Sequence, residues 1–179
     1  SSTRYGDGRT RDYLVWAQAA DFAGEEALDL GEGSDPDWSP DGTRLVYKGC
    51  DTAGDNCGLW TMALDGTARR QLTDNPGDAR PRWSPDGSRV VFMSDGRSGN
   101  WDVFSVLVDG GEVTQISFNA ASDGLPAVSP DGSEIVFVSN RGNQWGIWRV
   151  PVASGRAESV LGDLGALTNW LDQSLDWVP

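Results

Sequence analysis

The sequence predicts an all-β fold, a β-propeller made of four-stranded antiparallel blades. The tetrapeptide Ser-Pro-Asp-Gly begins at Ser39, Ser84 and Ser129, so it recurs every 45 residues. Its proline presets φ in a tight turn, and its glycine takes the left-handed conformation that closes a hairpin. Each repeat also holds four strand-like segments, which is the size of one propeller blade.

The repeat that starts at residue 81 displays the expected elements most clearly. Residues 81–84 form a short first strand that ends in the turn, and the apolar, β-branched residues 88–94 form the second strand. Residues 101–108 and 112–117 are expected to form the third and fourth strands. The same division places three complete blades at residues 36–73, 81–117 and 126–162.

The N-terminal part predicts a further blade that lacks its first strand. Trp60, Phe104 and Trp148 mark the third strand of each repeat at a spacing of 44 residues, and one more step back reaches Trp16. This register places the third and fourth strands of the first blade within residues 12–30. A rival interpretation makes residues 13–16 a second strand, because they are similar to residues 44–47.

The C-terminal residues supply the strand that the first blade lacks. Residues 172–179 are similar to residues 78–85, a first strand with the start of its turn. A ring of blades can close when one terminus adds a strand to the blade built by the other. We therefore expect a single domain over residues 1–179, a four-bladed ring whose first blade combines residues 12–30 with 174–179. Two arrangements remain open: a ring completed by two chains, and a part of a larger six- to eight-bladed propeller.

The chain is acidic, with 27 Asp and Glu against 14 Lys and Arg and a net charge of −13. Such a surface repels phosphate groups, so nucleic acids and anionic membranes are unfavourable partners. No apolar run reaches the roughly 20 residues of a membrane-spanning helix, so we expect no membrane insertion. Histidine is absent, which excludes Ser-His-Asp catalysis and histidine-ligated metal centres, and no cofactor is expected.

Two stretches carry a resemblance to a known family. Asp78-x-x-Pro81-x-Trp83 and Asp123-x-x-Pro126-x-Val128, each followed by Ser-Pro-Asp-Gly, resemble the TolB-like β-propeller repeat, and residues 71–75 resemble its fourth strand. Over residues 12–179 the resemblance implies a propeller, commonly of six or more blades, that is a docking surface for other proteins. It also implies a bacterial protein of the periplasm or the extracellular space. The same repeats occur on prolyl-oligopeptidase-like enzymes and in bacterial sensor proteins.

An aspartate stands at an equivalent place in three repeats, as Asp78, Asp123 and Asp172. Repeat symmetry puts these side chains at one end of the ring, beside the central channel. Converging carboxylates repel one another unless a cation bridges them, and Ca²⁺ binds several oxygen ligands in a flexible geometry. The pattern is compatible with a calcium site at the channel mouth. The alternative is that each aspartate accepts hydrogen bonds from backbone N–H groups of its own turn.

The two cysteines, Cys50 and Cys57, flank a short loop between two expected strands. They should face each other across the hairpin, where a disulfide is geometrically possible. A disulfide would indicate a compartment outside the reducing cytoplasm, whereas a pair of free thiols is the alternative.

Residues 164–171 interrupt the repeat with an unusually apolar connection that contains Leu167, Trp170 and Leu171. Apolar surface outside the repeat is a candidate partner site. The alternative is that this segment only covers the end of the ring.

The favoured function is a non-enzymatic scaffold that binds a protein or peptide, as a monomer or as a ring-completing homodimer. A carbohydrate-active, glycosidase-like enzyme is an alternative, because Asp123 and Asp172 could act as a carboxylate pair in a chain without histidine. A third possibility is a propeller fragment or an engineered chain that has no ligand of its own.

Overall fold

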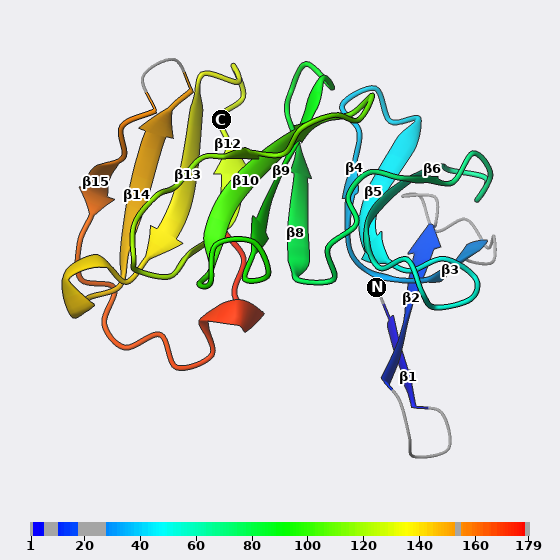
Figure 1. Ribbon diagram of the computed structural model, residues 1–179, viewed down its shortest axis with the longest axis horizontal. Helices are drawn as coiled ribbons and strands as arrows, with labels where there is room; N and C mark the ends of the chain where they lie inside the picture. Colours follow the sequence, from blue (N-terminus) through cyan, green and yellow to red (C-terminus); the bar gives the residue numbers. More distant parts are fainter. Residues whose placement is uncertain (1, 6–10, 18–27, 153–154, 178–179) are drawn as a thin grey trace, which may run out of the picture.

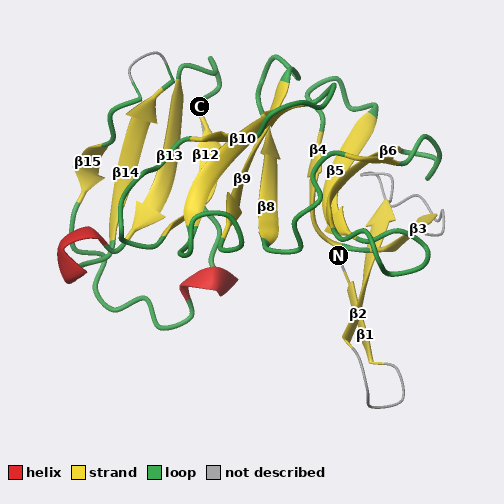
Figure 2. Cartoon of the chain, in the orientation of Figure 1, coloured by secondary structure: helices red, strands yellow, loops and turns green. Residues whose placement is uncertain are grey.

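The computed structural model describes residues 2–5, 11–17, 28–152 and 155–177, and it consists of four antiparallel sheets set side by side (Figure 1). One sheet has three strands, and the other three have four strands each. The prediction of an all-β protein with four-stranded blades is confirmed. In the described part, the helical segments are two 3-10 turns, η1 (Arg141–Asn143) and η2 (Trp170–Asp172), drawn in red in Figure 2. No helix in these ranges has the length and apolarity needed to cross a membrane.

Each four-stranded sheet is one blade, and its strands pair in chain order. Blade 2 consists of β4 (Ser34–Trp38), β5 (Arg44–Gly49), β6 (Gly58–Ala63) and β7 (Arg70–Gln71). Blade 3 consists of β8 (Asp78–Trp83), β9 (Arg89–Ser94), β10 (Asp102–Leu107) and β11 (Thr114–Gln115). Blade 4 consists of β12 (Asp123–Val128), β13 (Glu134–Ser139), β14 (Gly146–Pro151) and β15 (Glu158–Leu161).

The core lies in the apolar layers between consecutive blades. An aromatic pair spans the second and third strands of each blade: Tyr47 with Trp60, Phe92 with Phe104, and Phe137 with Trp148. The rings of blades 3 and 4 face the preceding blade, where they share clusters with β-branched residues such as Val46 and Val91. Because side chains alternate along a strand, each sheet presents one apolar face to the blade before it and one to the blade after it.

The Ser-Pro-Asp-Gly turns are held by the same hydrogen bonds in every blade. In blade 3 the Ser84 hydroxyl donates to Asp86 Oδ1 at 2.6 Å, and the Ser88 backbone N–H donates to the same oxygen at 3.0 Å. Gly87 has φ of 69°, the left-handed conformation that the motif predicts. The serine hydrogen bond and the turn N–H lower the pKa of Asp86 to about 2. In each repeated turn, the charged aspartate therefore accepts its hydrogen bonds from residues of the turn itself.

Each innermost strand contains a bulge with one residue in the left-handed conformation. The residues are Asp35, Arg80 and Leu125, with φ of 53°, 52° and 53°, and the strand register shifts beside each of them. A bulge redirects a side chain out of the regular alternation. Arg80 reaches the neighbouring innermost strand, where its Nη1 lies 3.3 Å from Asp35 Oδ1. The bulges thus bring side chains of adjacent inner strands together.

The N-terminal sheet, blade 1, has three strands, β1 (Ser2–Tyr5), β2 (Arg11–Ala17) and β3 (Leu28–Glu32). β2 pairs with β3 so that Trp16 lies opposite Asp29, as Trp60 lies opposite Gln71 in blade 2. This pairing matches the third-strand interpretation of the segment. The other neighbour of β2 is β1. Residues 178 and 179 of the predicted first strand lie outside the described residues, and residues 174–177 pair with no strand of blade 1.

Residues 173–177 form no strand, and they lie against blades 3 and 4. Leu175 joins the apolar cluster between these two blades. Trp177 borders a hollow with Val136 of blade 4, as Trp83 shares a cluster with Val46 of blade 2. The segment therefore lies where the first strand of a following blade would lie. Contact with blade 4 takes the place of the predicted pairing with blade 1.

Candidate functional site

All the site residues that the sequence predicts fall at one end of the blades, which we call the loop end. Here lie the loops that join second and third strands, at residues 50–57, 95–101 and 140–145, and the loops that lead from one blade to the next. The Ser-Pro-Asp-Gly turns join first and second strands, so they lie at the opposite end. The segment with η2 marks the loop end at the lower edge of Figure 1.

Asp78, a predicted cation ligand, is fully buried and paired with an arginine of its own blade. Arg97 donates from Nε to Asp78 Oδ1 at 2.8 Å and from Nη2 to Oδ2 at 2.6 Å. The guanidinium also lies over the rings of Phe92 and Phe104, at 5.6 and 6.0 Å from their centroids. A bidentate pair of this kind neutralises the carboxylate without a metal ion.

Asp123, the second predicted ligand, is paired with the equivalent arginine, Arg141, but through one hydrogen bond instead of two. Arg141 Nη2 donates to Asp123 Oδ2 at 2.7 Å, and the guanidinium lies over Phe137 and Trp148 at 5.3 and 4.6 Å. Asp123 Oδ1 and Arg141 Nε are buried and have no partner among the described residues. This pair is therefore weaker in geometry than the pair of blade 3.

Asp172, the third predicted ligand, lies in η2 and is exposed. The described residues contain no group of three Asp, Glu, Cys or His side chains that could hold a metal ion. The structure does not bring Asp78, Asp123 and Asp172 together. The physical reason is that Arg97 and Arg141 supply the positive charge that a bridging cation would supply.

Blade 2 departs from this pattern, because it has glycine at the aspartate position and at the position opposite it on the second strand. Gly33 and Gly49 stand where blade 3 has Asp78 and Ser94, as the strand registers show. The ring of Tyr47 fills the space, because a Cβ at Gly33 would lie 2.6 Å from Tyr47 Cδ2 and one at Gly49 would lie 2.8 Å from Tyr47 Cε2. The two glycines are thus required by the close approach of an aromatic ring.

An arginine from another element stacks on the aromatic pair of blade 2. Arg69, which precedes β7, lies over Tyr47 and Trp60 at 5.9 and 5.6 Å. Its Nε donates to Tyr47 Oη at 2.9 Å, and its Nη2 donates to the Cys50 carbonyl at 3.1 Å. Both acceptors are neutral: the Cys50 carbonyl carries no charge, and burial raises the pKa of the Tyr47 hydroxyl, which favours its protonated form. Among the described residues, no carboxylate forms an ion pair with Arg69.

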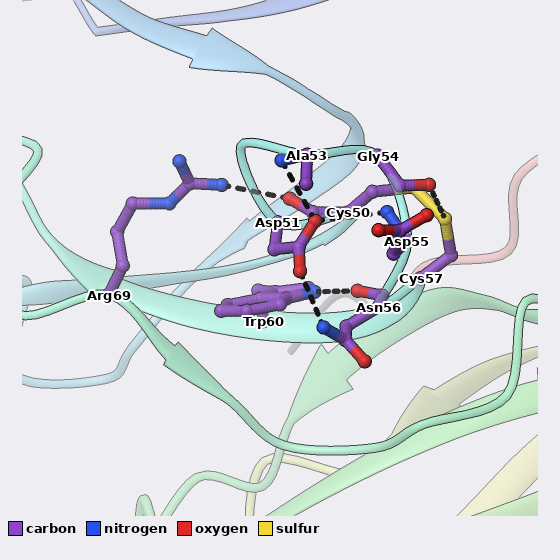
Figure 3. The surroundings of a disulfide bond; sticks show 9 residues. All are labelled: Cys50, Asp51, Ala53, Gly54, Asp55, Asn56, Cys57, Trp60 and Arg69. Atoms are coloured by element: carbon purple, nitrogen blue, oxygen red, sulfur yellow. Dashed lines mark hydrogen bonds between the residues drawn. A yellow bond between two sulfur atoms is a disulfide. The ribbon is translucent and has the colours of Figure 1, made fainter.

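The loop of residues 50–57 is closed by a disulfide between Cys50 and Cys57 (Figure 3). Inside the loop, Asp51 Oδ1 accepts hydrogen bonds from the backbone N–H groups of Asp55, at 2.9 Å, and Ala53, at 3.0 Å. These bonds, the one from Asp55 first, lower the pKa of Asp51. Two features therefore hold the loop: the disulfide, and the hydrogen bonds that the Asp51 carboxylate accepts from backbone N–H groups of the loop.

A cleft of about 720 Å³ opens beside this loop at the loop end of blade 2. Its lining includes Gly33, Gly49, Lys48, Arg69 and the loop itself. The ring of Tyr47 packs against the two glycines and lies beneath the cleft. The site thus combines a constrained loop with a guanidinium that no described carboxylate neutralises.

The predicted partner residues divide into two groups. Leu167 and Trp170 pack on the apolar cluster between blades 3 and 4, and Trp170 lies between Trp101 and Trp145 at 6.1 and 5.0 Å. Leu171 is exposed. Leu167 and Trp170 therefore cover the end of the blades, which was the alternative interpretation of this segment.

Sequence reasoning missed the three arginines that stack on the aromatic pairs of blades 2, 3 and 4, which are Arg69, Arg97 and Arg141. A signal was present for two of them, because Arg97 and Arg141 each follow a second strand in the two blades that begin with aspartate. Arg69 gave no such signal, since it reaches the aromatic pair from a different strand.

Blades of this pattern define a repeat protein of the propeller class. The chain belongs to the TolB beta propeller domain family, whose model matches residues 26–169. A putative TolB from Agrobacterium tumefaciens is 27% identical with a TM-score of 0.64, and the match covers 78% of this chain and 55% of that one. TolB from Acinetobacter baumannii is 21% identical with a TM-score of 0.66, covering 79% and 36%.

The same fold occurs in an enzyme, an oligogalacturonate lyase from Vibrio parahaemolyticus that is 15% identical with a TM-score of 0.62, covering 84% of this chain and 47% of that one. At such identity the likeness concerns the fold alone. The chain matches about half or less of the length of these three structures. A search of curated proteins found no match.

Proposed function

We propose that the chain is a non-enzymatic propeller unit that binds a segment of a protein or peptide in the cleft at the loop end of blade 2. The observation that carries this proposal is the cleft itself, which lies beside a loop closed by the disulfide Cys50–Cys57. Its volume of about 720 Å³ is within the range of ligand sites, about 300–1,000 Å³. A constrained wall lowers the entropy lost on binding.

The chemistry of the cleft suits a peptide better than a lipid or a nucleic acid. Charged side chains of both signs line it, Lys48 and Arg69 on one hand and Glu32 and Asp51 on the other. Membership of the TolB family supports the same proposal, because docking of other proteins is what the resemblance implies.

The absence of enzymatic activity is part of the proposal. Asp123, which a glycosidase would use as one of its two carboxyl groups, is fully buried and bonded to Arg141. Its expected partner Asp172 is exposed in η2. A fully buried carboxylate that is bonded to a guanidinium cannot reach a glycosidic bond, so the two groups are not arranged as a catalytic pair.

We further propose a location outside the cytoplasm of a bacterial cell. The disulfide Cys50–Cys57 supports this location, because such bonds persist in oxidising compartments. The TolB-like family points the same way. Treatment of the protein in its native cells with a thiol-specific reagent, followed by mass spectrometry, should find Cys50 and Cys57 unlabelled until they are reduced.

Selection from a random peptide library tests the proposed binding. Ala53 is exposed in the cleft wall, so Ala53→Trp should fill the cleft, and Ala120→Trp makes the same change at an exposed site outside it. Peptides selected on the wild-type chain should bind Ala120→Trp equally well and lose at least tenfold in affinity for Ala53→Trp. Peptides that bind all three proteins alike would contradict the cleft as the binding site.

A further inference from the structure

The three stacked arginines differ in one respect that points to the chemistry of the ligand. Arg97 and Arg141 each meet a buried carboxylate of their own blade, whereas both acceptors of Arg69 are neutral oxygens. In blade 2, Tyr47 Oη takes the part of Asp78 Oδ1 toward the arginine Nε, at 2.9 Å instead of 2.8 Å. A phenol satisfies the hydrogen bond but carries no charge, so it does not compensate the guanidinium as the carboxylates of blades 3 and 4 do.

The guanidinium of Arg69 is also held in a fixed orientation before any ligand binds. Two aromatic rings and two hydrogen bonds fix the plane of its guanidinium, so little side-chain entropy is left to lose on binding. A guanidinium has five N–H donors, and these bonds use two of them. Lys48 lines the same cleft and adds a second positive charge.

Neither acidic side chain that lines the cleft is a counter-ion of Arg69 among the described contacts. Asp51 is occupied by the N–H groups of its own loop, and the exposed Glu32 forms no ion pair with Arg69 among the described contacts. Gly33 stands at the position of Asp78 and Asp123, and the Tyr47 ring fills the space of a side chain there, so blade 2 has no carboxylate at this position. An acidic group that enters the cleft would meet Arg69 on the N–H groups that Tyr47 and Cys50 leave free.

We infer that the cleft binds an acidic peptide through Arg69, with an aspartate or glutamate side chain of the peptide on the N–H groups of the guanidinium that Tyr47 and Cys50 leave free. This inference rests on the proposed peptide-binding function and names the chemistry of its ligand. A carboxylate on Arg69 makes charge-assisted hydrogen bonds, whereas an amide of the same shape makes weaker neutral ones. Discrimination between the two should be about tenfold in affinity.

Two short peptides that differ by one group provide the test: Ac-Gly-Asp-Gly-NH₂ and Ac-Gly-Asn-Gly-NH₂. Titration of each into the ¹⁵N-labelled wild-type chain is followed by NMR, with the Arg69 Nε–H and Trp60 indole N–H signals as local reporters. We expect the aspartyl peptide to bind about tenfold more tightly and to shift the Arg69 signal. Arg69→Gln should abolish the difference between the peptides.

Arg70→Gln is the matched control, because it removes the same charge from the next residue. Arg70 donates to the Asp109 carbonyl and lies outside the cleft lining, so this variant should keep the preference. Equal affinity of the two peptides for the wild-type chain, or binding of neither, would overturn the inference whatever the variants do. The library selection with Ala53→Trp decides separately whether any peptide docks in the cleft, so a failure of the carboxylate role and a failure of the binding function give different results.

Discussion

The buried ion pair of blade 3 allows a quantitative test of how the blades are stabilised. We expect Asp78→Asn to lower the free energy of unfolding by about 2–3 kcal/mol. Asp78 is fully buried and accepts two bonds from Arg97, whose side chain is 19% exposed. Asparagine keeps one acceptor oxygen, so the variant loses one charge-assisted bond and leaves the guanidinium without a counter-ion.

The pair of blade 4 provides an internal comparison. Asp123 accepts one bond from Arg141, and its Oδ1 has no partner among the described residues. Asparagine can keep the bonded oxygen and place its amide at the position of Oδ1. Asp123→Asn should therefore cost about 1–2 kcal/mol, less than Asp78→Asn.

Urea unfolding followed by tryptophan fluorescence measures both changes, with the free energy obtained by linear extrapolation. Asp74→Asn is the control, because Asp74 is exposed and should change stability by no more than about 0.5 kcal/mol. The reasoning is refuted if Asp78→Asn is as stable as the control, or if Asp123→Asn costs more than Asp78→Asn.

Three further outcomes are expected. The pKa of Asp86 is about 2 in the folded chain and about 3.9 in an unfolded one, so its stabilising effect is present above about pH 4 and is lost as the pH falls through about 2. Unfolding followed by circular dichroism over this range should therefore be less pH-dependent in Asp86→Asn, and curves of equal slope would contradict this role. Reduction of the disulfide, or the double change Cys50→Ser and Cys57→Ser, should lower the free energy of unfolding by about 2–3 kcal/mol from loop entropy alone. Unchanged stability in urea would mean that the hydrogen bonds of Asp51 hold the loop without the bond. Addition of Ca²⁺ should leave the melting temperature unchanged, because Arg97 and Arg141 neutralise Asp78 and Asp123, and a rise with Ca²⁺ concentration would restore the calcium site.

The sequence predicts the blades well because their signals are local. The turn at Ser84 depends on residues at most five positions apart, and the structure places its hydrogen bonds among those same residues. Strand alternation is equally local. The blade architecture follows from such short-range chemistry repeated at a fixed period.

The candidate site could not be predicted because its parts come together only in the folded chain. Asp78 and Arg97 are 19 residues apart, and Arg69 and Tyr47 are 22 residues apart. Repetition of aspartate suggested a shared cation, since a sequence alone does not tell whether a carboxylate faces its neighbours or an arginine. The prediction of a strand at residues 174–177 was wrong for a related reason: these residues resemble a first strand, but strand pairing depends on which sheet edge lies beside them.

The bulges of the innermost strands have a consequence for how such proteins diverge. The same left-handed residue is aspartate in one blade, arginine in the next and leucine in the third, while the hydrogen-bonded ladder on either side is retained. The same backbone conformation therefore accommodates charged and apolar side chains. Asp35 and Arg80 use it to form an ion pair between adjacent inner strands, whereas Leu125 is buried in the apolar cluster between blades 3 and 4. The chemistry of this position thus varies from blade to blade while the scaffold that carries it is retained.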